Sequence, residues 1–143
     1  MKSSKKLSCV LIIDDDPTSN FFHQNMIEEL DSKVNIQICQ DAEHALEYLV
    51  RKSMFSEFRP TPAPDLILLD IYMPGMSGWD FIDEYNKIRS QLQKEATIAM
   101  ISSSSDPKDL LMAEENTFVQ KFIPKAVDGI HLKNWINENY VQQ

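Results

Sequence analysis

Three short apolar runs in this sequence each lead directly into charged residues. The runs and their charges are residues 10–13 before Asp14, Asp15 and Asp16, residues 66–69 before Asp70, and residues 122–124 before Lys125. Apolar runs of this length, with turn signals after them, indicate strands that are buried on both faces. In an open parallel sheet, the residues just beyond the carboxyl ends of the strands converge on one crevice. The sequence therefore predicts one pocket that holds at least three carboxylates and one ammonium group.

Carboxylates gathered at this density repel one another. At ~4–5 Å and an effective dielectric constant near 20, each pair costs roughly 3–4 kcal/mol. Such a cluster needs a cation, or some of its members must hold protons. The candidate ligands are hard oxygens, and no histidine or thiol matches the pocket, which favours Mg2+. We therefore expect a divalent metal site built around an aspartate that can act as a nucleophile.

Composition limits the partners and the location that fit this chain. Its 143 residues are typical of one domain, which we expect to span residues 1–143. The net charge of −8 argues against nonspecific binding to nucleic acid, which needs a basic surface. No apolar stretch approaches the length of a membrane span, and the apolar run after the basic residues 1–6 is too short for a signal peptide. We therefore expect a cytoplasmic protein that binds neither nucleic acid nor membranes.

Strand-like and helix-like patterns alternate along the chain. The expected strands are residues 7–13, 34–39, 66–69, 96–101 and 119–123, and the expected helices are residues 17–30, 42–49, 81–92, 107–116 and 132–140. In the first helix Phe22, Met26 and Leu30 are four apart, and aromatic side chains on the helices are expected in the core. Five strands alternating with five helices imply right-handed crossovers and an α/β fold with one doubly wound parallel sheet.

Asp-Pro dipeptides mark the starts of two helices. Residues 16–17 and 106–107 both place an N-cap aspartate before a proline at the first helical position. Asp109 follows three residues after the second cap, which is a weak capping-box pattern. One helix needs one cap, so Asp14 and Asp15 remain for another role.

The cysteines and histidines are assigned no chemistry. Cys9 and Cys39 fall near opposite ends of neighbouring strands, too far apart for a disulfide, and are expected as buried reduced thiols. His23, His44 and His131 lie on predicted helices away from the strand ends. We expect them at the surface or at its boundary.

Two aromatic features keep alternative roles. The proline-rich residues 53–64 form a long loop in which Phe55 and Phe58 either extend the second helix or contact a partner. Trp79 begins the third helix near Asp70, where it either packs or reports metal binding by fluorescence.

The residues at the strand ends resemble a known family. The matching motifs are Val-Leu-Ile-Ile-Asp-Asp-Asp-Pro at 10–17, Pro-Asp-Leu-Ile-Leu-Leu-Asp-Ile-Tyr-Met-Pro-Gly-Met-Ser-Gly at 64–78, Ile-Ser-Ser at 101–103 and Phe-Ile-Pro-Lys at 122–125. Over nearly its whole length the sequence closely resembles the receiver domain of two-component response regulators, of the stand-alone CheY-like kind. The resemblance implies a (βα)5, flavodoxin-like fold whose strands lie in the order 2-1-3-4-5.

The resemblance also implies a phosphoryl-acceptor site. Asp70 would accept a phosphoryl group from a phosphohistidine. Asp15 and Asp70, with the backbone carbonyl of Tyr72, would bind Mg2+ directly, and Asp14 would act largely through metal-bound water. These implied roles agree with the chemistry, because phosphoryl transfer needs positioning and charge neutralisation more than covalent help.

Three further residues receive roles from the resemblance. Ser102 would hydrogen-bond the phosphoryl group, Lys125 would pair with its oxygens, and Phe122 would be the aromatic switch residue that follows Ser102 inward. The partners would be a sensor histidine kinase or a histidine phosphotransfer protein, and a downstream protein target that the sequence does not name. Such a protein is not an enzyme beyond its own phosphotransfer and dephosphorylation.

The sequence departs from the family pattern at two places. The family usually has Lys-Pro with a cis peptide bond that aims the lysine, whereas here Pro124 precedes Lys125 and Ala126 follows it. A cis bond before a non-proline residue costs ~2.5–4 kcal/mol, so the geometry of the Lys125–Ala126 bond stays open. The proline fits an edge strand. The second departure is Tyr72, whose ring could shield an acyl phosphate from water.

Three other functions share parts of this pattern. A haloacid-dehalogenase-type phosphatase needs a second acid two residues after the nucleophile, where Tyr72 stands. A flavodoxin-like nucleotide binder needs a first loop that cradles phosphate, and residues 14–16 would repel it. The third alternative is a receiver-like interaction module that works without phosphorylation.

Overall fold

The computed structural model describes residues 5–54, 63–92, 94–103, 106–125 and 128–141, which form a layered α/β fold. Its strands are β1 (Lys5–Lys6), β2 (Cys9–Ile13), β3 (Asn35–Cys39), β4 (Leu66–Asp70), β5 (Thr97–Ser102), β6 (Val119–Pro124) and β7 (Tyr140–Val141). Its helices are α1 (Pro17–Leu30), α2 (Ala42–Met54), α3 (Gly78–Ile88), the 3-10 helix η2 (Arg89–Gln91), α4 (Pro107–Glu115) and α5 (Asp128–Asn139).

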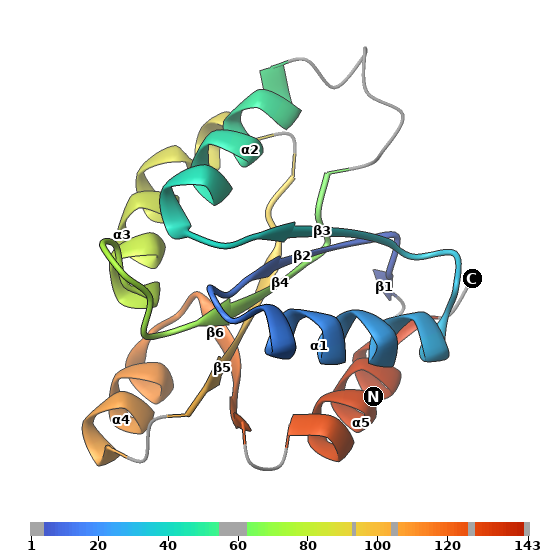
Figure 1. Cartoon of the computed structure of the whole chain (residues 1–143). Helices are drawn as coiled ribbons and strands as arrows, with labels where there is room; N and C mark the ends of the chain where they lie inside the picture. The colour runs from blue at the N-terminus through green and yellow to red at the C-terminus, as the bar shows by residue number, and fades with distance from the viewer. Residues whose placement is uncertain (1–4, 55–62, 93, 104–105, 126–127, 142–143) are drawn as a thin grey trace.

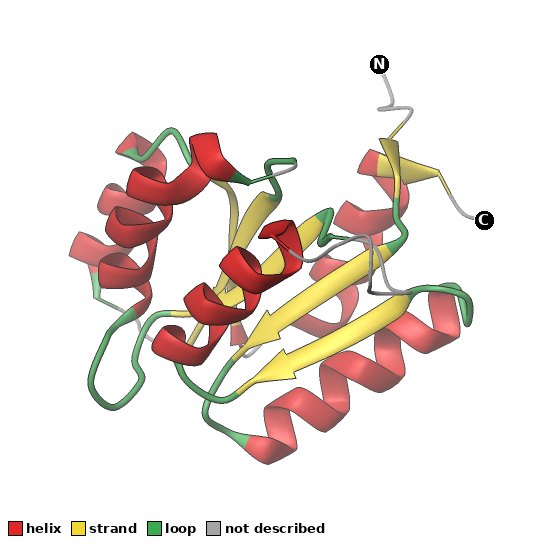
Figure 2. Ribbon diagram, turned by 90° about the horizontal axis from the view of Figure 1, so that it is seen from above, coloured by secondary structure: helices red, strands yellow, loops and turns green. Residues whose placement is uncertain are grey.

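Five parallel strands form the main sheet of this described part, in the order β3-β2-β4-β5-β6. This order confirms the predicted doubly wound fold and places β6, with Pro124, at an edge of the sheet. Helices α1 and α5 cover one face, and α2 and α3 cover the other (Figures 1 and 2). Helix α4 lies beside the edge strand β6 (Figure 1).

The central strands are apolar because both of their faces are covered. All residues of β2 and of β4 are buried. Successive side chains point to opposite faces, so Val10 and Ile12 enter the core under α1 and α5. Leu11 and Ile13 enter the core under α2 and α3. This burial holds the carboxyl ends of both strands in fixed register.

The helix starts follow local capping rules. The side chains of Asp16 and Asp106 accept hydrogen bonds from the backbone N–H groups of Thr18 and Lys108, which confirms both predicted N-caps. A reciprocal capping box forms at α3, between Ser77 and Asp80. The Asp109 carboxylate instead contacts other elements, as described below.

Helix α1 buries a different face from the one expected. Its buried residues are Asn20, His23, Met26 and Ile27. His23 is 1% exposed, so its expected place at the surface is wrong, whereas His44 and His131 are exposed as predicted. Phe22 is 47% exposed and is not a core residue. Residues 20, 23 and 27 therefore form the buried face of α1, and the ring of Phe22 lies outside this face.

The ends of the described chain form a second, small sheet that the sequence pattern did not indicate. Strand β1 pairs in parallel with β7, with Lys5 opposite Tyr140. Cys9 and Cys39 lie at opposite ends of the paired strands β2 and β3 and form no disulfide, as predicted. Cys9 is buried as expected, whereas Cys39, on the outer strand β3, is only half-buried. Phe55 and Phe58 fall outside the described residues. Within the described part, no helix is both long and apolar enough to cross a membrane.

Asp65 ties together three segments at the amino end of the sheet. Its Oδ2 accepts hydrogen bonds from the backbone N–H groups of Ser8, at 2.6 Å, and Cys9, at 3.0 Å. Its Oδ1 accepts one from Lys94 Nζ at 2.5 Å. The carboxylate therefore fixes the start of β2, which carries the site residues at its other end.

We predict that Asp65→Ala lowers the free energy of unfolding by about 1–3 kcal/mol, because two partly buried N–H groups lose their acceptor. Urea denaturation of the variant and the wild type measures the change. Asp83→Ala, on the exposed side of α3, is the matched control and should change stability by no more than about 0.5 kcal/mol. Equal stabilities for Asp65→Ala and the wild type would contradict this role.

Candidate functional site

Asp70 ends the central strand β4 and is 6% exposed. A hydrogen bond joins the two ends of the loop that follows Asp70, because the backbone N–H of Gly78 donates to the carbonyl of Ile71 at 2.7 Å. A Cβ at Gly78 would lie 2.5 Å from the backbone oxygen of Asp70, so this close approach requires glycine. Gly75, with φ of +80°, makes the turn within the loop. The loop therefore closes tightly beneath Asp70.

Asp14 and Asp15 follow the neighbouring strand β2. Asp14 is 3% exposed, and its Oδ1 accepts a hydrogen bond from the backbone N–H of Asp16 at 3.0 Å. Its backbone carbonyl accepts a hydrogen bond from Asn20 Nδ2 at 2.9 Å. Asp15 is exposed and lines a groove of about 420 Å³ beside Pro74 and Met76. One carboxylate is thus fixed inside the pocket, and the other lies at its open side.

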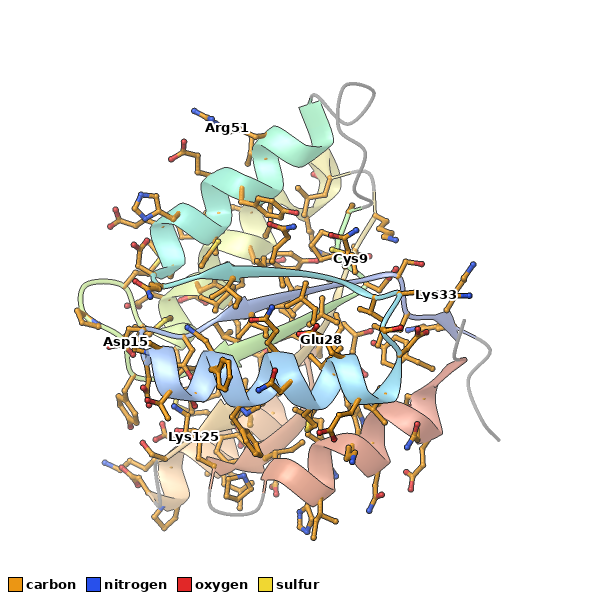
Figure 3. The ribbon with its side chains drawn as sticks, turned by 45° about the vertical axis from the view of Figure 1, so that its right-hand side comes forward. Cys9, Asp15, Glu28, Lys33, Arg51 and Lys125 are labelled. Carbon is orange, nitrogen blue, oxygen red and sulfur yellow. The ribbon has the colours of Figure 1, made fainter. Side chains whose placement is uncertain are left out.

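The three carboxylates converge at the carboxyl end of the sheet. Asp14, Asp15 and Asp70 each offer an oxygen, and these oxygens lie within 4.8 Å of one another. Lys125, just after β6, places its Nζ 3.0 Å from Asp14 Oδ2 and 3.8 Å from Asp70 Oδ1. Figure 3 shows Asp15 and Lys125 at the same end of the molecule, opposite to Lys33. The structure brings together the four charged residues that the strand ends predicted.

The electrostatics of the cluster favour a cation. Burial raises the pKa of Asp70 from 3.8 to about 7, and the charges of Asp14 and Asp15 add to this while Lys125 opposes it. Burial acts against the charge of Lys125, but its hydrogen bond to Asp14 and the nearby carboxylates outweigh burial and raise its pKa. One ammonium group therefore leaves the carboxylates incompletely neutralised.

The donor set fits Mg2+. All three side chains offer carboxylate oxygens, the ligands that hard divalent cations prefer, and their spacing allows one ion to contact them or their bound waters. The open side at Asp15 leaves space for such waters. Asp14, Asp15 and Asp70 are the residues that would hold the ion.

Ser102 and Phe122 lie on the two strands beyond β4. Ser102 is fully buried at the end of β5, one residue past the position that pairs with Asp70. It pairs with Pro124 of β6, so it neighbours Lys125. Phe122 pairs with Met100 and is half-buried against the core under α2 and α3. The Lys125–Ala126 peptide lies outside the described residues.

Tyr72 contacts a residue on α4 whose tertiary role sequence reasoning missed. Its hydroxyl donates to Asp109 Oδ2 at 2.5 Å, and Trp79 Nε1 donates to Asp109 Oδ1 at 3.2 Å. Asp109 is 5% exposed. Its spacing from Ala113, the other buried residue of α4, is a helical i, i+4 pair. This spacing, which places an acidic residue on the buried side of the helix, was the sequence signal that could have indicated a tertiary role for Asp109.

Comparison with known proteins shows the family of this chain. A family model for the response regulator receiver domain matches residues 10–137. The chain belongs to the response regulator receiver domain family, and it is a receiver domain of two-component signalling. Two-component response regulator ARR14 of Arabidopsis thaliana is 32% identical over 84 residues, which are 58% of this chain and 19% of that protein. The match thus spans a small part of the longer relative.

Solved structures share the fold. A two-component response regulator from Cytophaga hutchinsonii has a TM-score of 0.74 and 29% identity, with 93% of this chain and 96% of that chain covered. The receiver domain of the histidine kinase CKI1 from Arabidopsis thaliana, complexed with Mg2+, has a TM-score of 0.75 and 20% identity, with 95% of each chain covered. At that identity the second likeness supports the fold alone.

The raised pKa of Asp70 predicts a pH-dependent stability. Between about pH 4 and pH 7 the native protein binds more protons at Asp70 than the unfolded chain does, so the free energy of unfolding falls as pH rises through this window. Asp70→Asn removes this loss. With a chelator present, the stability advantage of the variant should grow across the window by up to about 4 kcal/mol, at about 1.4 kcal/mol per pKa unit. A pH-independent difference in urea denaturation would contradict the assigned pKa.

Proposed function

We propose that this chain is a phosphoacceptor receiver that takes a phosphoryl group onto Asp70 from a phosphohistidine and then changes its binding to a protein target. The observation that carries the proposal is the convergence of three carboxylates and Lys125 at the carboxyl ends of β2, β4 and β6. The donor would be a sensor histidine kinase or a histidine phosphotransfer protein. Mg2+ would be held by Asp14, Asp15 and Asp70, with the backbone carbonyl of Tyr72.

The transfer uses an oxygen of Asp70 as the nucleophile. A P–O bond forms to Asp70 as the P–N bond of the phosphohistidine breaks, and its electron pair returns to the donor imidazole. When bound, Mg2+ supplies positive charge that offsets the phosphoryl oxygens and favours ionised Asp70. The groove beside Asp15 leaves an open approach to this side of the pocket.

Lys125 and Ser102 complete the proposed acceptor site. The ammonium group of Lys125 forms a 3.0 Å ion pair with Asp14 and lies 3.8 Å from Asp70. There it can pair with phosphoryl oxygens. Ser102 ends β5, the strand beside β4, and its hydroxyl group would hydrogen-bond the phosphoryl group. Phe122, on the edge strand, would follow Ser102 inward as the switch residue.

The proposal extends to the setting of the protein. We expect residues 1–143 to act as one receiver domain in the cytoplasm, through protein partners and not through nucleic acid or membranes. The net charge of −8 supports this expectation. Chemistry other than its own phosphotransfer and dephosphorylation is not part of the proposal.

We predict that Asp70→Asn abolishes labelling by acetyl phosphate with Mg2+, because the amide is not a nucleophile of this kind. Intact-protein mass spectrometry measures the label, and circular dichroism checks that the fold is kept. Asp83→Asn is the matched control and should be labelled like the wild type. A label that persists in Asp70→Asn would contradict the assignment. A wild type that takes no label would support the alternative of a phosphorylation-independent interaction module.

We predict that millimolar Mg2+ raises the Tm by several degrees, compared with a monovalent salt of equal ionic strength. A ligand that binds only the folded state at about 100 times its Kd contributes about 2.7 kcal/mol. Asp15→Ala should remove more of this shift than Asp14→Ala, since Asp15 is the proposed direct ligand. The reverse order would exchange the two roles, and an unchanged wild-type Tm would contradict the metal site.

A further inference from the structure

Helix α4 is attached to the protein with its apolar side chains outward. Its two buried residues are Asp109 and Ala113, at 5% and 4% exposed. Leu110, Leu111 and Met112 are 48%, 54% and 45% exposed. A surface helix normally buries its large apolar residues and exposes its charges. The large apolar residues of α4 are therefore only half buried, and its buried inward face carries an acidic residue, Asp109.

Asp109 makes polar contacts outside α4. Its two carboxylate oxygens accept hydrogen bonds from Tyr72 Oη at 2.5 Å and from Trp79 Nε1 at 3.2 Å. Both bonds are partly buried, and a hydrogen bond in such low-dielectric surroundings is stronger than one in water. Tyr72 itself is 54% exposed, and this bond joins its hydroxyl to the buried Asp109.

Both donors lie next to the residues Ile71 and Gly78, which form the neck of the loop that follows Asp70. The hydrogen bond from Gly78 N to Ile71 O closes the neck, Tyr72 follows Ile71, and Trp79 follows Gly78. Asp109 thus holds one donor on each side of the neck. A displacement of this loop would act on α4 through two contacts at once.

We propose that Asp109 is a positioning residue that latches α4 to the neck of the Asp70 loop through Tyr72 and Trp79. The latch keeps α4 in an orientation that burial of its apolar residues would disfavour. Release of the latch frees α4 to move and to redirect Leu110, Leu111 and Met112. The coupling of this release to Asp70 rests on the proposed phosphoacceptor function, whereas the latch itself does not.

Amide hydrogen exchange, without Mg2+ or a phosphoryl donor, tests the latch in the whole chain. Tyr72→Phe removes one donor and Asp109→Ala removes the acceptor of both. The α4 amides should exchange faster in Tyr72→Phe by roughly 2- to 10-fold, the factor expected for one lost hydrogen bond, and faster still in Asp109→Ala. Adding Tyr72→Phe to Asp109→Ala should have no further effect, since the acceptor is already absent.

The control is Asp83→Ala on α3, which should leave α4 exchange unchanged. Because Asp109 is buried, global stability of each variant is measured by urea denaturation, and Tyr72→Phe serves as the milder test. Wild-type exchange of α4 in Tyr72→Phe and Asp109→Ala would overturn the latch. Fully additive effects in the double variant would also overturn it.

Beryllofluoride with Mg2+, a mimic of the phosphoryl group, tests the coupling. It should speed exchange of α4 in the wild type and leave α4 of Asp109→Ala, already released, unchanged. Altered exchange around Asp70 with unaltered α4 would overturn the coupling and leave the phosphoacceptor function standing. No change anywhere in the wild type, as in Asp70→Asn, would contradict both the coupling and the proposed function.

Discussion

The mutual repulsion of Asp14, Asp15 and Asp70 is the constraint on which the rest of this site depends. The strands hold these side chains together, because every residue of β2 and β4 is buried and the register of the sheet is fixed. One ammonium group, from Lys125, contacts two of the three carboxylates and neutralises them in part. Burial, with the charges of Asp14 and Asp15 added to it, raises the pKa of Asp70 to about 7. A bound cation would reduce the repulsion among the carboxylates and favour the charged form of Asp70.

The sequence was sufficient for the fold and for the convergence of the charged residues. Apolar runs that end in Asp14, Asp70 and Lys125 predict strands, and the topology of a parallel sheet brings their carboxyl ends together. The caps at Asp16 and Asp106 were equally readable, since an N-cap depends on neighbouring residues alone. These features are local in sequence or follow from strand order.

Features that depend on how one helix is rotated against its neighbours were not readable. His23 is buried and Phe22 is exposed because α1 turns a polar stripe inward, which weak apolar periodicity did not indicate. Asp109 looked like part of a cap, yet it serves as a tertiary acceptor for Tyr72 and Trp79. The rotation of α4 likewise leaves Leu110, Leu111 and Met112 exposed.

The most direct test of the central claim is a carbon-13 NMR titration of the Asp70 side-chain carboxyl group, with and without saturating Mg2+. Asp70→Asn identifies the resonance. Burial of Asp70 beside Asp14 and Asp15 predicts a midpoint near pH 7 without the ion, and a midpoint at least one unit lower with it, because a bound cation favours the charged form. A midpoint near the ordinary value of 3.8, unmoved by Mg2+, would contradict the account.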